Sequence, residues 1–156
     1  MKKLLTLLIL IGTLWACNRQ QHTENKIKLV DSETTEARQG TSAERLELNN
    51  GTKWKVDLST NNNVKNLQEI LKKFREGKDR SLPAYQQTQK ELQQGIDKMI
   101  SECRMSGPDH EALHKWLEPL IAQVAQLKQA STVQEAASAF KAIDTRADIY
   151  DQYFEL

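Results

Sequence analysis

The sequence feature that most constrains the fold is an apolar spacing of three and four residues, which recurs in four stretches from residue 60 onward. That spacing places apolar side chains on one face of a helix. It predicts helices over residues 61–76, 82–104, 108–129 and 133–154. Because the connections between these stretches are short, consecutive helices are expected to lie antiparallel. The predicted fold class is therefore all-α, an antiparallel up-down four-helix bundle.

Capping signals mark several ends of the predicted helices. Thr132 and Glu135 form a capping box at the start of the last helix, in which each side chain satisfies a backbone N–H. Thr60 or a neighbouring asparagine is expected to cap the first helix, and Gly77 is expected to end it. Pro119 lies inside the third helix, where its missing N–H predicts a kink.

A short β-hairpin is predicted before the helices. Between residues 45 and 56, apolar and charged residues alternate on either side of Asn50-Gly51. Asn-Gly between alternating runs is the strongest short-range signal for a hairpin. Since an isolated hairpin is only marginally stable, we expect this one to pack on the helices through Trp54.

The first 16 residues have the order of a secretory signal. Lys2 and Lys3 precede residues 4–11, which are apolar except for Thr6, and Gly12 to Ala16 follow. The run is too short for a permanent transmembrane helix, which needs about 20 apolar residues. We therefore expect residues 1–16 to be removed during export.

The sequence Leu14-Trp15-Ala16-Cys17 resembles the lipobox of bacterial lipoproteins. The resemblance implies cleavage before Cys17, lipidation of its thiol and three acyl chains, where two already give stable membrane anchoring. Trp15 departs from the family, which usually has a small residue there. Asn18 is not the aspartate that typically signals inner-membrane retention, so the expected location is the outer membrane of a bacterial cell envelope. The alternative is an ordinary cleaved signal followed by an unrelated cysteine.

Residues 17–43 are expected to comprise the lipidated cysteine and a flexible tether, and residues 44–156 the folded domain. The tether is polar and has no sustained apolar period. Loss of Lys2 and Lys3 with the signal reduces the 22 basic residues to 20, against 21 acidic residues. This balance gives no reason to expect a nucleic acid partner, and no basic run indicates binding to anionic headgroups.

Candidate metal ligands gather between the second and third predicted helices. Cys103, Met105, His110 and His114 lie within 12 residues. The two histidines are four residues apart, so both imidazoles project from one side of a helix, a spacing that presents two nitrogens to one ion. A turn at residues 106–108 is expected to fold the thiol and the thioether back toward them.

This ligand set leaves several ions open. Thiolate and thioether select copper(I), whereas imidazole suits copper and zinc, so all four ligands together favour copper. Without Met105, the thiol and two imidazoles suit zinc, with a carboxylate or water as the fourth ligand. Haem held by His and Met is a third alternative, although no C-x-x-C-H motif for covalent attachment is present. Asp148 or Asp151 is the candidate to orient a histidine.

Two motifs also resemble a group of small helical lipoproteins of the bacterial envelope. These are N-N-G-x-K-W, here Asn49 to Trp54, and C-x-M-x-G-x-x-H-x-x-L-H, here Cys103 to His114. The resemblance implies a helical exported domain and no particular activity.

Taken singly, the candidate ligands also suit plain packing, because a free cysteine behaves as a small hydrophobic residue. No paired carboxylates, phosphate-binding glycine loop or nucleophile elbow is recognisable, so no enzymatic activity is predicted. The leading hypothesis is a membrane-anchored protein that binds copper or zinc for sequestration, transfer or sensing. The alternative is a cofactor-free interaction or structural lipoprotein that docks an envelope protein through a helix face or the Trp54 hairpin.

Overall fold

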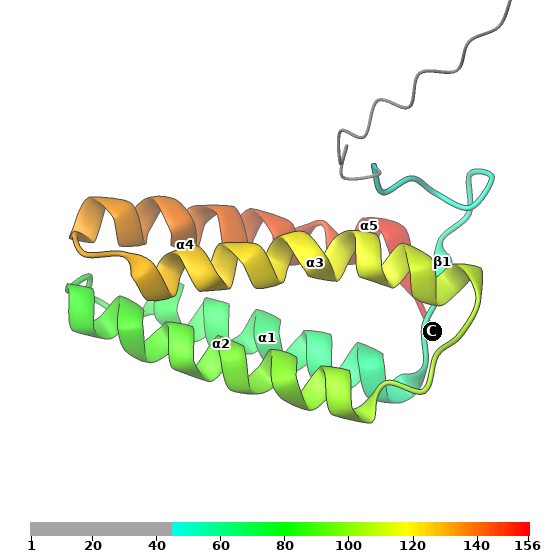
Figure 1. Ribbon diagram of the computed structural model, residues 1–156, viewed down its shortest axis with the longest axis horizontal. Helices are drawn as coiled ribbons and strands as arrows, with labels where there is room; N and C mark the ends of the chain where they lie inside the picture. The colour runs from blue at the N-terminus through cyan, green and yellow to red at the C-terminus, as the bar shows by residue number, and fades with distance from the viewer. Residues whose placement is uncertain (1–44) are drawn as a thin grey trace, which may run out of the picture. The chain divides into compact units, whose positions relative to one another are not determined.

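The computed structural model describes residues 45–156, so the predicted signal, Cys17 and the tether lie outside the described residues. The described chain is mostly helical, as the sequence predicted (Figure 1). Its elements in order are β1 (Trp54–Lys55), α1 (Leu58–Glu76), α2 (Leu82–Glu102), α3 (Pro108–Gln129), α4 (Val133–Asp148), α5 (Tyr150–Tyr153) and β2 (Phe154–Glu155).

The four long helices pack against one another in pairs. The most extensive contacts join α1 to α2 and α3 to α4. Figure 1 shows the α3–α4 pair above and the α1–α2 pair below. Further contacts join α2 to α3 and α1 to α4. The Cβ of a side chain at Gly95 of α2 would lie 2.6 Å from Leu67 Cδ2 of α1. The missing side chain therefore allows the first pair to approach closely.

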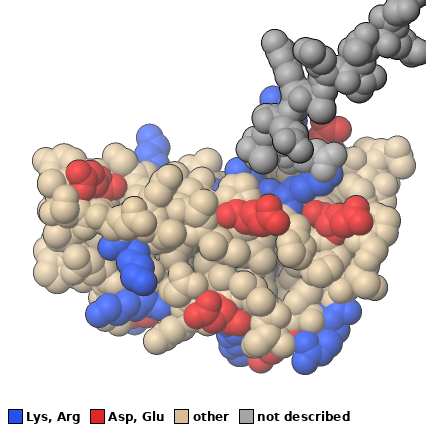
Figure 2. All heavy atoms as spheres, viewed as in Figure 1, with Lys and Arg blue, Asp and Glu red and all other residues tan. Residues whose placement is uncertain are grey.

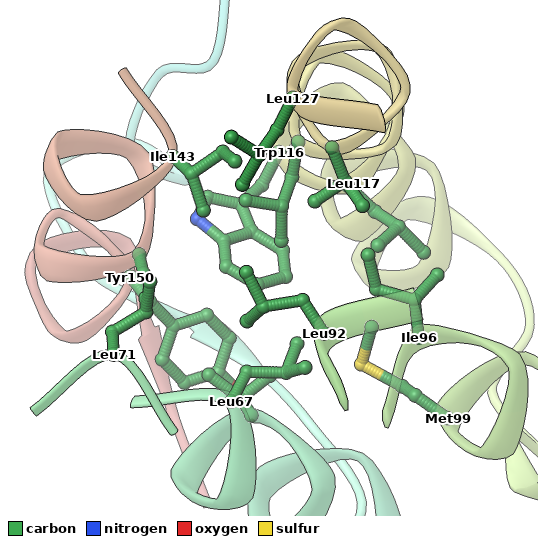
Figure 3. Close-up of a cluster of buried hydrophobic side chains, with 14 of the residues drawn as sticks. Leu67, Leu71, Leu92, Ile96, Met99, Trp116, Leu117, Leu127, Ile143 and Tyr150 are labelled. Atoms are coloured by element: carbon green, nitrogen blue, oxygen red, sulfur yellow. The ribbon is translucent and has the colours of Figure 1, made fainter. Parts of the chain in front are cut away.

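The core between the helices is one cluster of apolar side chains (Figure 3). Trp116 of α3 is 0% exposed, and its indole N–H donates to the Arg146 carbonyl oxygen at 2.8 Å. Its ring lies edge-on to that of Tyr150, with the centroids 5.1 Å apart. A buried indole N–H without a partner is costly. The hydrogen bond removes that cost and at the same time links α3 to the end of α4.

Of the predicted antiparallel hairpin, the structure shows the turn and a single bridge, and the strand that follows pairs elsewhere. The turn itself is present: Asn50 and Gly51 have φ of 50° and 87°, and an isolated antiparallel bridge joins Asn49 to Thr52. Beyond the turn, however, β1 pairs in parallel with β2 at the other end of the described chain. Trp54 lies opposite Phe154 in this pairing.

The physical reason for this correction is burial. Phe154 is 2% exposed and stacks on Tyr150 with the ring centroids 4.9 Å apart. Pairing β1 with β2 holds that aromatic residue in the core. Trp54 packs against the same core, as was predicted for this segment. Lys55 strengthens the pairing, because its ammonium group donates to the Leu156 carbonyl oxygen at 2.9 Å.

The helix ends agree with the sequence at most positions. The Thr132–Glu135 capping box is present and Gly77 follows α1, as predicted. The first helix begins earlier than expected, because Asp57 rather than Thr60 accepts the capping hydrogen bond, at 2.6 Å from Thr60 N. The last helix ends at Asp148 instead of continuing to residue 154. After the break at Ile149, the one-turn helix α5 follows, and Phe154 then begins the extended strand β2.

Candidate metal centre

The two histidines of the candidate site lie in the first two turns of α3. Gly107 precedes the helix with φ of 72°, a conformation that L side chains rarely adopt. Pro108 then occupies the first helical position, where its missing N–H does no harm. The His110 backbone N–H donates to the Gly107 carbonyl oxygen at 3.0 Å. The sharp turn therefore fixes where the first imidazole leaves the helix.

The imidazoles of His110 and His114 face each other through the same ring nitrogen. Their Nε2 atoms are 3.1 Å apart, and the rings meet edge-on with centroids 4.6 Å apart. Zn–N bonds of about 2.0–2.1 Å place two ligands of one tetrahedral ion about 3.3 Å apart. A small rotation of the rings would bring the observed separation of the two nitrogens to that value. The observed separation also permits an imidazole–imidazole hydrogen bond.

Glu118 contacts the second histidine from the next turn of the helix. Its Oε1 lies 3.4 Å from His114 Nδ1. An Nδ1–H that points at a carboxylate fixes the tautomer in which Nε2 carries the free lone pair. The carboxylate thus favours a ligand nitrogen on the side that faces His110.

The site is open to solvent. The His114 side chain is 49% exposed and the Glu118 side chain 72% exposed, and His110 is half-buried. The imidazoles border a hollow on the surface of α3, lined by His110, Glu111, His114, Lys115, Glu118, Pro119 and Ala122. A metal held here would keep coordination positions that other ligands can reach.

The other two predicted ligands have a different environment. Cys103 is the C-cap residue that follows α2, and its backbone N–H donates to the Met99 carbonyl oxygen at 3.0 Å. Cys103 and Met105 are both partly buried and pack against the hydrophobic core. Among residues 45–156, no three His, Cys, Asp or Glu side chains are grouped to hold a metal ion. The structure brings the two imidazoles together and does not group the thiol with them.

Neither of the aspartates proposed to orient a histidine contacts one in the structure; both pair with α1. Asp151 accepts from Lys65 Nζ at 2.9 Å and from Gln68 Nε2 at 3.2 Å. Burial raises the pKa of the Asp151 carboxyl, but these hydrogen bonds outweigh it and the net pKa is lowered. Asp148 lies 3.9 Å from an Arg75 guanidinium nitrogen. Glu118 takes the orienting position instead, and its spacing of four residues from His114 was the signal that the sequence offered.

Charges of both signs surround the folded helices. On the face drawn in Figure 2, acidic and basic side chains are interspersed among uncharged ones.

In the described part of the chain, none of the helices combines the length and the apolar character that membrane crossing requires. Comparisons with protein-family models, with curated proteins and with solved structures found no match to this chain.

Proposed function

We propose that this chain is a membrane-anchored lipoprotein of the bacterial cell envelope that binds a transition-metal ion through His110 and His114. The observation that carries the proposal is the pair of Nε2 atoms 3.1 Å apart, with Glu118 on the opposite nitrogen of His114. The lipobox ending at Cys17 supports the membrane attachment. The spacing and the short connections of the helices support an up-down four-helix bundle as the scaffold.

The packing of Cys103 and Met105 changes which ion the site favours. With the thiol and thioether against the core, the ligands that remain are two imidazole nitrogens. Imidazole is a borderline ligand that suits copper(II) and zinc, whereas copper(I) is selected by sulfur. Copper(II) or zinc is therefore the proposed ion.

The exposure of the site supports a role in metal exchange. Two protein nitrogens leave coordination positions for water or for a second donor, unlike a closed structural site with four protein ligands. Because His114 is half-exposed, a bound ion can enter and leave without unfolding of the helix. Sequestration, transfer or sensing of the ion would each use such a site.

A second candidate function is a cofactor-free interaction module. Leu58 begins α1 and is 64% exposed, and Ile100 near the end of α2 is 53% exposed. The Ser59 hydroxyl donates to the Glu102 carbonyl oxygen at 3.2 Å, so these two helix ends are adjacent. Two large apolar side chains exposed at one end of the domain support docking of an envelope protein there.

The deciding experiment is a calorimetric titration of the purified chain with copper(II) and, separately, with zinc. The variant carries His110→Ala and His114→Ala, and its matched control carries His22→Ala, which removes the third histidine of the sequence. We expect the double variant to lose at least ~100-fold in affinity, because direct ligands exceed the 10–100-fold loss typical of their outer partners. Equal binding by the double variant and the control would exclude the metal function and favour the interaction module.

A further inference from the structure

The His110–His114 pair supplies only half of the ligands that a zinc ion takes from protein in a closed site. Zinc is almost always four-coordinate when it is held by protein side chains alone. Among the residues that the structure describes, no third His, Cys, Asp or Glu is placed to join the two imidazoles. Glu118 lies against Nδ1 of His114, on the far side of the ring from the nitrogen that faces His110.

We propose that a second copy of this chain completes the site, so that two His110–His114 pairs bind one zinc ion with four imidazole nitrogens across a two-fold axis. This inference rests on the proposed metal function and names its partner. In a symmetric dimer the same surface patch meets itself. Each copy contributes two identical nitrogens, and the 3.1 Å separation within a pair is close to the ~3.3 Å edge of a tetrahedral zinc site.

The surface around the pair allows a second helix to approach. The core-facing residues of α3, such as Leu113 and Leu117, are buried, whereas the histidines lie along the edge of the outer face. The hollow beside them includes Pro119 and Ala122, whose side chains are short. A neighbouring α3 can therefore come close enough for imidazoles from both copies to reach one ion.

The charges of this face also permit self-association. Glu111, Lys115 and Glu118 border the same hollow, so the patch carries both signs. A patch of mixed sign does not repel a second copy of itself as a patch of one sign would. A different protein partner would have to carry its own matched pair of ligands, while a second copy carries them by symmetry.

The proposal predicts a particular dependence on zinc. With half an equivalent of zinc per chain, two copies share one ion and the dimer is most abundant. With a large excess of zinc, each copy binds its own ion and the dimer dissociates by mass action. Dimer formation should therefore rise and then fall as zinc is added.

The test uses the full chain purified in detergent, with light scattering to measure the protein mass and elemental analysis to measure bound zinc. We expect a monomer in chelator and a dimer with one zinc per two chains at half an equivalent. His110→Ala and, separately, His114→Gln should weaken the dimer by at least ~100-fold at unchanged helix content, because each removes two of four direct ligands. The His22→Ala control should behave as the parent.

The outcomes separate this inference from the proposed function. A monomer that binds one zinc per chain would overturn the shared site and leave the metal function standing. A dimer that persists in chelator and in both histidine variants would also overturn it, because association would then be independent of the ion. Absence of zinc binding in the parent chain would overturn the shared zinc site, and absence of both zinc and copper(II) binding would overturn the proposed function as well.

Discussion

The four candidate ligands come from one short stretch of sequence, but they lie on two sides of α3 with different environments. Cys103 and Met105, just before the helix, pack with the inner face against the core. His110 and His114 lie toward the outer face, where the second imidazole is half-exposed. Candidate ligands that are close in sequence can therefore lie in different environments when only some of them share a helix face. Proximity within 12 residues is thus a weaker indicator of a shared site than a common helix face.

The largest expected effect falls on the inner face. Trp116→Ala should lower the free energy of unfolding by about 3–5 kcal/mol, because it removes a fully buried aromatic ring and leaves a cavity. The substitution also removes the hydrogen bond to the Arg146 carbonyl oxygen. Urea denaturation followed by circular dichroism measures the change. A loss below about 1 kcal/mol would mean that the ring is not central to the core.

The next effect falls on the outer face and concerns affinity. Glu118→Gln should weaken metal binding by roughly tenfold, because the amide no longer stabilises the Nδ1–H of His114 as a carboxylate does. Stability should change by less than about 0.5 kcal/mol, since the side chain is largely exposed. Calorimetric titration measures the affinity, and Glu111→Gln is the matched control on the same helix. An equal effect of both substitutions would point to general charge rather than orientation.

A smaller effect separates the two faces directly. Cys103→Ser should lower the free energy of unfolding by about 1 kcal/mol, because it places a hydroxyl where a partly buried thiol packs on the core. Metal affinity should stay at the parental value, since the thiol is not grouped with the imidazoles. Thermal unfolding and a metal titration of the same preparation test both statements. Loss of affinity in a fully folded variant would show that Cys103 is a ligand after all.

The smallest effect concerns Asp57, which links α1 to the segment that carries Cys103. Its carboxylate accepts from Thr60 N at 2.6 Å and from Arg104 N at 3.3 Å. Burial raises the pKa of this carboxyl, but the hydrogen bonds from Thr60, Ser59 and Arg104 outweigh it and leave the pKa lowered. The ionised group therefore stabilises the fold above its ordinary pKa of about 3.9, and this contribution is lost as the pH falls through the lower folded-state pKa.

Asp57→Asn provides the test of that pH dependence. Asparagine still caps a helix but does not ionise, so stability near neutral pH should fall by less than about 1 kcal/mol. The decline in stability below pH 4 should become shallower than in the parent chain. Unfolding curves between pH 2 and pH 6 measure the difference. Identical slopes in the two proteins would show that the capping carboxylate does not couple to folding.

Much of the helical framework could be predicted from local sequence. The apolar spacing located the four long helices, and Thr132, Glu135 and Gly77 marked ends that the structure reproduces. These signals are local, because a helix satisfies its backbone hydrogen bonds within a few residues. Asp57 was missed because the first helix was expected to begin three residues later.

The sheet and the details of the site could not be predicted in the same way. Trp54 and Phe154 are paired although they lie near opposite ends of the described sequence. The spacing of Ala147, Tyr150 and Phe154 fits a continuing helix equally well. The environment of Cys103 depends on how the turn after α2 meets the core, which no local pattern reports. The His110–His114 pair was predictable because both residues share one helix.

The most direct test of the contrast between the two faces is X-ray absorption spectroscopy of the zinc-loaded chain. We expect a first shell of nitrogen and oxygen at about 2.0–2.1 Å, with the imidazole scattering of His110 and His114. The signal should be unchanged in Cys103→Ser. A sulfur shell at about 2.3 Å that disappears in that variant would contradict the assignment of Cys103 to the core and of the metal to the histidine face alone.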